Sequence, residues 1–208
     1  MIHPDYPAPD EVDAWCLRLL TTADETPVAA RALDAPQYSY QLGVRHTRGN
    51  QYIAFEAEGR PTFYGYWQPA PTLPAPILFH VPSYAAEIAA HPGLVAEGFN
   101  VLHVNPLGYY TPLGPGRKDQ NWTVLPDTVK SKGEHGYVDW LTDAVLAVQW
   151  ALSRGDVCPE RFAFFGTSQG GGGALLLGSL FVGRGRAIRW SPAASRRPRF
   201  LPSAVQGT

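Results

Sequence analysis

The segment RFAFFGTSQG, residues 161–170, carries the strongest structural signal in the sequence. Its first half is a short apolar run, which predicts a buried strand over 161–165. An apolar segment follows over 170–182 and is long enough for a helix. The junction, 166–170, matches the pattern G-x-S-x-G, which between a strand and a helix is typical of a nucleophile elbow. Such a turn exposes a reactive serine above a sheet, and here that serine is Ser168.

The two glycines of this pattern have a physical purpose. Ser168 must occupy a strained turn, and we expect any side chain at Gly166 or Gly170 to clash with the neighbouring strand and helix. The amide groups at the start of the following helix point toward the same place and can stabilise an oxyanion. The backbone N–H of Gln169 is therefore a predicted oxyanion donor.

Two other interpretations of the glycine-rich junction compete with the elbow. The first is a strand-to-helix turn with no chemistry. The second is a phosphate-binding loop, but Leu175 and Leu176 stand where G-x-G-x-x-G needs its last glycine. No Gly-Lys-Ser/Thr follows either, so the sequence favours the elbow.

Strands and helices alternate on the amino-terminal side of this junction. The further predicted strands cover 52–58, 62–68, 77–81 and 99–104, with a hairpin turn at 58–61. The predicted helices cover 11–22, after a cap at Asp10, then 85–97 and 137–154. Residues 24–49 show no clear pattern, and 105–135 form a long predicted loop. Apolar strands that alternate with helices predict an α/β fold with a mainly parallel sheet and helices on both faces.

The segment FGTSQGGG, residues 165–172, and its lead-in DVCPER, residues 156–161, resemble the acetyl xylan esterase and cephalosporin C deacetylase family. Members of that family are α/β-hydrolases whose elbow reads G-x-S-Q-G-G. The segment 137–144 is similar to the helix before the family's elbow, and the resemblance covers about residues 50–182. It implies the N-terminal part of an α/β-hydrolase fold, with the C-terminal strands missing.

The resemblance also implies an activity and a set of site residues. The activity is that of a serine ester hydrolase that deacetylates acetylated sugars or similar small esters. Ser168 would be the nucleophile, and the backbone N–H groups of Gln169 and Tyr84 would form the oxyanion hole. Tyr84 lies in PSYAA, residues 82–86, at the place of the family's H-G-Y-x-G loop. The elbow alone does not distinguish this activity from that of another acyl hydrolase of the fold, such as a peptidase or a dienelactone-type enzyme.

A serine nucleophile needs a base to accept its proton and an acid to orient that base. In this fold both follow the serine in the chain, yet no Asp, Glu or His occurs after Ser168. We therefore expect the chain to be catalytically incomplete; a non-catalytic remnant or pseudoenzyme, or an enzyme completed in trans by another chain, stays open. Among upstream groups, His80 and His103 are interpreted as strand histidines, and Asp139 and Asp143 as solvated or capping residues.

The sequence changes character near Gly183. Residues 184–208 carry six arginines and no acidic residue, whereas residues 1–183 carry the other 11 basic residues and all 18 acidic ones. We expect an N-terminal arm and helix over 1–49, an incomplete α/β-hydrolase core over 50–183 and a basic tail over 184–208 that is foreign to the family. A truncated or frame-shifted product would explain this tail, and the alternative is a basic arm for nucleic acid or another acidic surface.

The overall composition excludes several classes of protein. A hydrophobic fraction of 45% is that of a globular chain. No apolar run reaches the roughly 18 residues that a membrane span needs, and the first residues do not resemble a signal peptide. Cys16 and Cys158 are interpreted as free thiols of a reducing compartment, so we expect a cytoplasmic protein. With a formal net charge of −1 we expect a small acyl-ester substrate and no nucleic-acid or membrane partner.

Two expectations concern metals and self-association. The histidines are widely spaced in the sequence, so we expect no zinc site, and no cofactor is implied. Because no further strands follow the elbow helix, the strand at 161–165 would lie near an open edge of the sheet. An exposed apolar edge pairs readily with other chains, so we expect self-association there.

Overall fold

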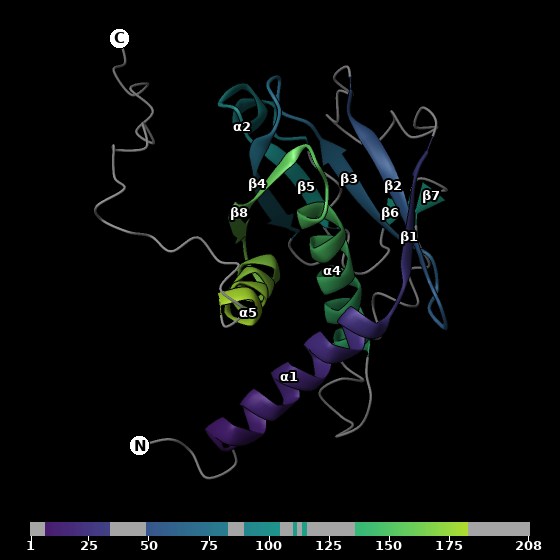
Figure 1. Cartoon of the computed structure of the whole chain (residues 1–208), viewed down its shortest axis with the longest axis vertical. Helices are drawn as coiled ribbons and strands as arrows, with labels where there is room; N and C mark the ends of the chain where they lie inside the picture. The colour runs from purple at the N-terminus through teal and green to yellow at the C-terminus, as the bar shows by residue number, and fades with distance from the viewer. Residues whose placement is uncertain are drawn as a thin grey trace, which may run out of the picture.

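A six-stranded mixed sheet forms the centre of the molecule (Figure 1). The computed structural model describes residues 7–33, 49–82, 90–104, 110–111, 114–115 and 136–182. In spatial order the strands are β1 (Val28–Leu33), β2 (Gln51–Ala57), β3 (Phe63–Gln68), β5 (Asn100–Val104), β4 (Ala75–Val81) and β8 (Val157–Gly166). Two short strands, β6 (Tyr110–Thr111) and β7 (Gly114–Pro115), pair with each other outside this sheet.

The strand direction changes halfway across the sheet. β1, β2, β3 and β5 pair antiparallel in that order, with β2 and β3 forming the predicted hairpin. β4 runs parallel to both of its neighbours, β5 and β8. The predicted hairpin is therefore confirmed, and the predicted strands at 77–81, 99–104 and 161–165 form the parallel part of the sheet. β1 adds a strand in the region where the sequence showed no clear pattern.

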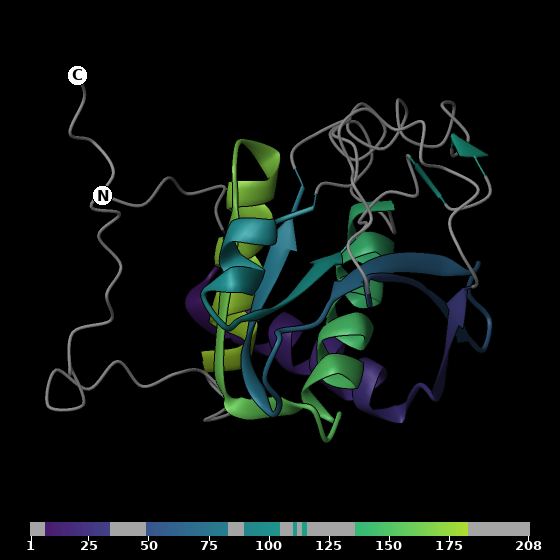
Figure 2. The same ribbon diagram turned by 90° about the horizontal axis from the view of Figure 1, so that it is seen from above.

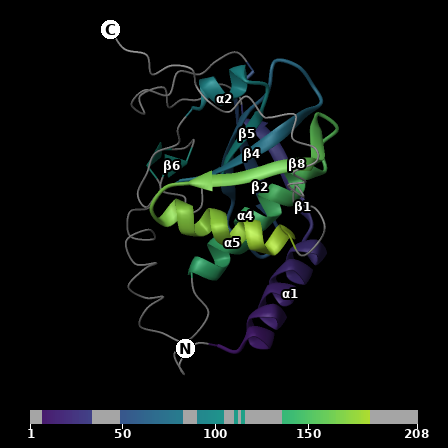
Figure 3. The ribbon, with the colours of Figure 1, turned by 90° about the vertical axis from the view of Figure 1, so that its left-hand side faces the viewer.

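The helices lie on both faces of the sheet, as the sequence predicted. On one face pack α1 (Pro9–Glu25), α4 (Gly136–Leu152) and α5 (Gln169–Val182), and on the other lies α2 (Pro92–Ala96) (Figures 1 and 3). Figure 2 views the molecule from the α2 side, with α5 behind the sheet. None of the described helices is long and apolar enough to cross a membrane.

Two helices begin at residues other than those predicted. The N-cap of α1 is Ala8, not Asp10, and its backbone N–H donates a 2.8 Å hydrogen bond to the Glu11 carboxylate. Proline is favoured in the first helical turn, and Pro9 therefore starts this helix one residue before Asp10. Of the helix predicted at 85–97, the structure shows only α2, which begins at Pro92; residues 83–89 lie outside the described residues.

Aromatic and aliphatic side chains fill the space between the sheet and the face covered by α4 and α5. Four phenylalanines join β4, β8 and α5, with ring centroids 5.0–6.3 Å apart; they are Phe79, Phe162, Phe164 and Phe181. Fully burying one such side chain contributes roughly 1.5–3 kcal/mol. This packing fixes the position of α5 relative to the two parallel strands that precede it.

A buried asparagine joins the loops at the amino-terminal ends of the parallel strands. The Asn100 side chain accepts a hydrogen bond from the Ala70 N–H at 2.9 Å. It donates to the carbonyl oxygens of Ala75 at 3.3 Å and Asp156 at 2.9 Å. Asn100 is fully buried, and its amide satisfies backbone groups that water does not reach; the Asp156 carbonyl also accepts a 3.2 Å hydrogen bond from the Ala75 N–H.

Within the described sheet, β8 is an edge strand. It pairs with β4 on one side, and no described strand lies on its other side (Figure 3). The predicted open edge is thus present in the described part of the chain. The predicted division into 1–49, 50–183 and 184–208 stays a prediction, although β1 from the first segment joins the sheet of the second.

Candidate active site

Ser168 lies at the tip of the turn between β8 and α5. β8 ends at Gly166 and α5 begins at Gln169, so the strand–turn–helix arrangement is as predicted. The φ angle of Ser168 is 54°, and no other non-glycine residue of the described chain has a positive φ. L-residues avoid this left-handed region, and they occupy it where the surrounding structure requires it. The residue is exposed, which presents the hydroxyl to solvent.

The flanking glycines are required by close backbone contacts. A Cβ atom on Gly166 would lie 2.6 Å from the carbonyl carbon of Gly170 and closer still to the carbonyl oxygen of Val81. A Cβ atom on Gly170 would lie 2.6 Å from the carbonyl oxygen of Pro82. Real Cβ atoms do not approach other atoms this closely, so the predicted clashes with strand and helix are confirmed.

The amino-terminal end of α5 is directed at the same turn. The Ser168 carbonyl accepts hydrogen bonds from the N–H groups of Gly171 at 3.0 Å and Gly172 at 3.2 Å, which begins the helical ladder. The first N–H groups of a helix have no acceptor within it, and they carry the positive end of the helix dipole. Gln169 stands at this position, as an oxyanion donor would. Tyr84, the other predicted donor, lies outside the described residues.

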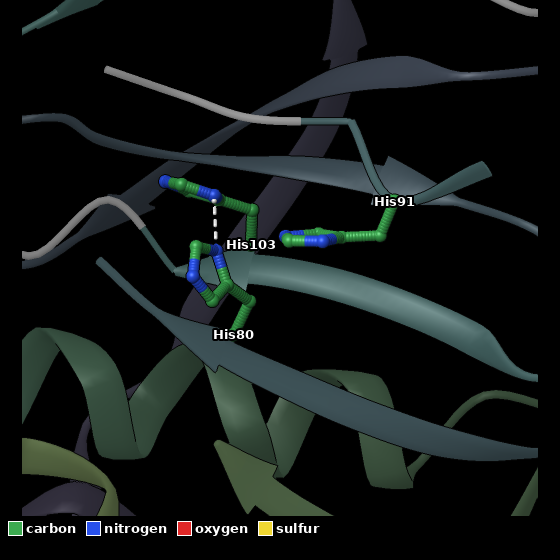
Figure 4. Close-up of side chains that lie close together, drawn as sticks. All are labelled: His80, His91 and His103. Carbon is green, nitrogen blue, oxygen red and sulfur yellow. Dashed lines mark hydrogen bonds between the residues drawn. The ribbon is translucent and has the colours of Figure 1, made fainter. Parts of the chain in front are cut away.

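Three histidines meet on the α2 face of the sheet, a cluster that sequence reasoning missed. His80 of β4 and His103 of β5 stand opposite each other in the parallel register, and their Nδ1 atoms are 2.8 Å apart (Figure 4). His91, just before α2, places its ring centroid 4.4 Å from that of His80. The wide spacing of the histidines in the sequence did not indicate this cluster, and the expectation of no zinc site stays a prediction. A signal was available: each of two adjacent apolar strands carries one histidine near its end.

Burial keeps these histidines uncharged. It lowers the pKa of His80 to about 4, with a further contribution from the nearby His91. Burial also lowers the pKa of His91, and it places the pKa of the fully buried His103 well below the usual value. All three imidazoles are neutral at pH 7. Between His80 and His103 one Nδ1 donates the hydrogen bond and the other accepts it.

The described residues do not supply Ser168 with a base or an acid. No hydrogen bond joins Ser168 to a histidine within the described part of the chain. Asp143 is neither solvated nor a cap, because its Oδ1 accepts a 2.7 Å hydrogen bond from Nε of Arg60 in a half-buried ion pair. The side chain of Asp139 lies outside the described residues. The missing base and acid are thus not found among the upstream groups that the structure describes.

This sheet order, with a parallel strand leading into a positive-φ serine and a glycine-flanked helix, is that of the N-terminal part of an α/β-hydrolase fold. Two similar solved structures are an acetyl xylan esterase from Paenibacillus sp. R4 and acetyl xylan esterase 1 from Thermoanaerobacterium sp. JW/SL YS485. The first is 18% identical with a TM-score of 0.56, over 85% of this chain and 58% of that chain. The second is 16% identical with a TM-score of 0.60, over 84% and 56%.

The matches cover most of this chain but only part of each esterase. The chain spans less than two thirds of the length of either esterase. Neither a protein-family model nor a curated protein matches the sequence. At such low identity the likeness shows a shared fold, and that fold agrees with the one predicted from the elbow.

Proposed function

We propose that this chain carries the nucleophile half of a serine ester hydrolase, with Ser168 as the nucleophile. The observation that carries the proposal is the conformation of Ser168: exposed, at a φ of 54°, between a parallel strand and the N-terminus of a helix. Backbone strain of this kind costs of order 1–3 kcal/mol and is concentrated at functional sites. A turn without chemistry could place any small residue there in a relaxed conformation.

The chemistry follows from the geometry of the turn. The Ser168 hydroxyl would attack the carbonyl carbon of a small acyl ester, such as an acetylated sugar. The oxyanion would be stabilised by the N–H of Gln169, with Tyr84 as the proposed second donor. Collapse of this intermediate would release the alcohol and leave an acyl-enzyme, which water then hydrolyses. The two solved neighbours, both acetyl xylan esterases, support an ester as the substrate.

The chain by itself lacks the group that would activate Ser168. No Asp, Glu or His follows Ser168, and Asp143 is engaged with Arg60. We therefore propose that the isolated chain turns over esters very slowly. A triad-less site keeps roughly 10³–10⁴-fold catalysis over water from binding and the oxyanion hole. The absent base equally supports the second candidate, a non-catalytic remnant that at most binds a ligand.

Added imidazole distinguishes the two candidates, because it can replace a missing base. We expect p-nitrophenyl acetate turnover far below the usual range of about 1–10³ per second, and nearly equal in wild type and Ser168→Ala. With imidazole added, the proposal requires that wild type turns over the ester faster than Ser168→Ala. Subtracting the Ser168→Ala rate also corrects for the direct reaction of imidazole with the ester. Equal rates in both proteins would establish the non-catalytic remnant instead. Specific activity that rises with protein concentration would indicate completion in trans.

A further inference from the structure

We propose that His80, His91 and His103 bind one divalent transition-metal ion, and that Zn²⁺ is the ion that suits them best. One ligand nitrogen from each of the three rings can be chosen so that all lie within 4.8 Å of one another (Figure 4). This site is on the α2 face of the sheet and does not depend on the function proposed for Ser168.

The three imidazoles are held by different parts of the fold. His80 and His103 stand on adjacent parallel strands, whose ladder fixes the separation of the two backbones. His91 is held by its own backbone N–H, which donates a 2.6 Å hydrogen bond to Oε1 of Gln68. Gln68 lies on β3 and is only 1% exposed, so it is a rigid anchor. The cluster is therefore an arrangement set by the sheet rather than a chance meeting of surface side chains.

One ring nitrogen is left without a protein partner. Nε2 of His91 is buried and makes no hydrogen bond to any described residue. Buried polar atoms are nearly always satisfied, so an unpaired imidazole nitrogen beside two other imidazoles is a candidate ligand atom. A metal ion accepts the lone pair that this nitrogen offers.

The donor set selects the class of ion. The cluster contains only imidazoles, without a carboxylate from the described residues, and so it does not suit Ca²⁺ or Mg²⁺, which prefer oxygen. Three imidazoles with one open position are a known arrangement for Zn²⁺.

Binding requires a small rearrangement of the rings. Zn–N bonds of about 2.0–2.1 Å in a tetrahedral site place neighbouring nitrogens about 3.4 Å apart. The nitrogens of His80 and His103, now 2.8 Å apart, would separate and exchange their hydrogen bond for metal bonds. Ligand nitrogens that are now up to 4.8 Å apart would also have to move closer together, by rotation about side-chain torsions. The bound ion would then fasten the segment before α2 to β4 and β5.

Metal titration of the purified full chain tests the site. After removal of metals with a chelator, calorimetry with Zn²⁺ should show one ion per chain, and saturating Zn²⁺ should raise the melting temperature. Co²⁺ should give the visible absorption bands of a four- or five-coordinate site. His91→Gln should weaken Zn²⁺ binding at least about tenfold, since losing even a supporting partner of a ligand costs 10–100-fold.

Controls separate this site from other metal ligands and from misfolding. Cys158→Ser removes a free cysteine outside the cluster and should leave the Zn²⁺ affinity unchanged. His91 is only partly buried, so His91→Gln should fold, as circular dichroism will show; His80→Gln provides a second variant. Absence of saturable binding at one ion per chain would overturn the proposal. So would equal affinity of folded His91→Gln, His80→Gln and wild type.

Discussion

Ser168 keeps its left-handed backbone conformation because close contacts on both sides fix the path of the chain through the turn. Gly166 and Gly170 bring the backbones of β8 and α5 against the end of β4, and Ser168 connects them over a single turn. The strain at Ser168 is therefore offset by packing elsewhere in the turn. Substitution of the surrounding glycines tests this account residue by residue.

The glycines 170–173 differ sharply in what surrounds them. Gly170→Ala should destabilise the fold by about 2–3 kcal/mol or more, because its Cβ would meet the backbone of Pro82. Gly172→Ala should stabilise it by about 0.5–1 kcal/mol, because nothing lies within 4 Å of the new Cβ and alanine favours the helix. Urea unfolding of the two variants measures both effects. Similar stabilities for the two would contradict the described packing of the turn.

Asn100 should be among the most sensitive polar residues of the molecule. Asn100→Ala should cost about 2–4 kcal/mol, because it removes the hydrogen bonds to the buried backbone groups of Ala70 and Ala75 and one of the two that the Asp156 carbonyl accepts. Asn50→Ala is the matched control, since the Asn50 side chain makes one 3.0 Å hydrogen bond, to the Tyr66 hydroxyl. It should cost only about 0.5–1.5 kcal/mol. Thermal unfolding at fixed pH compares the two, and an Asn100 effect no larger than that of Asn50 would contradict the assigned role.

For single residues, the sequence predicted the serine turn but not the histidine cluster. Gly166, Ser168 and Gly170 are neighbours in the chain, so their local geometry could be inferred from residue types and flanking elements. His80, His91 and His103 meet only through the β4–β5 register and the connection before α2. Sequence spacing does not contain that register, and this explains why the cluster was missed. Ala8 was missed as a cap because it has no capping side chain.

A largely buried ion pair connects α4 to the β2–β3 hairpin. Arg60 and Asp143 have side chains 17% and 18% exposed, with Nε and Oδ1 2.7 Å apart. A double-mutant cycle with Arg60→Gln and Asp143→Asn should give a coupling free energy of about 1–2 kcal/mol. The same cycle on Arg31 and Glu56, 3.6 Å apart with side chains 66% and 55% exposed, should give about 0.5 kcal/mol or less. Equal couplings would contradict a structural role for the Arg60–Asp143 pair.

The most apolar strands were the easiest to predict from the sequence. β4, β5 and the end of β8 are short apolar runs, which is what strands covered on both faces require. β1 has the sequence VAARAL, in which three alanines and one arginine give no clear alternation of apolar and polar residues, so the strand signal was weak. It forms because the edge of β2 is available for pairing, which is a property of the assembled sheet.

The whole molecule should self-associate through the β8 side of the sheet. β8 has one described neighbour, and α5 beside it exposes Leu175 and Leu176 at 78% and 40%. An apolar edge of this kind pairs with other chains. We expect oligomers or aggregates in size-exclusion chromatography, and we expect Leu175→Lys to reduce them. Leu17→Lys is the matched control, because Leu17 is 63% exposed but lies on α1.

Two results would contradict this expectation. One is a monodisperse monomer with a single cooperative transition above about 50 °C, within the usual range of mesophilic domains. The other is an equal effect of Leu175→Lys and Leu17→Lys, which would make the association non-specific. The first result would show that the β8 side is already covered in solution, and the second that the association does not run through it.

The position of β4 affects structures on both faces of the sheet. Its side chains alternate, so Phe79 and Val81 face α5 while His80, between them, faces α2. A Cβ atom at Gly166 or Gly170 would collide with the carbonyl oxygen of Val81, and His80 is the residue directly before Val81. A shift of β4 by one residue would therefore disturb the turn and the histidine cluster at once. The serine turn and the histidine cluster share one strand, so a change that moves the end of β4 changes both.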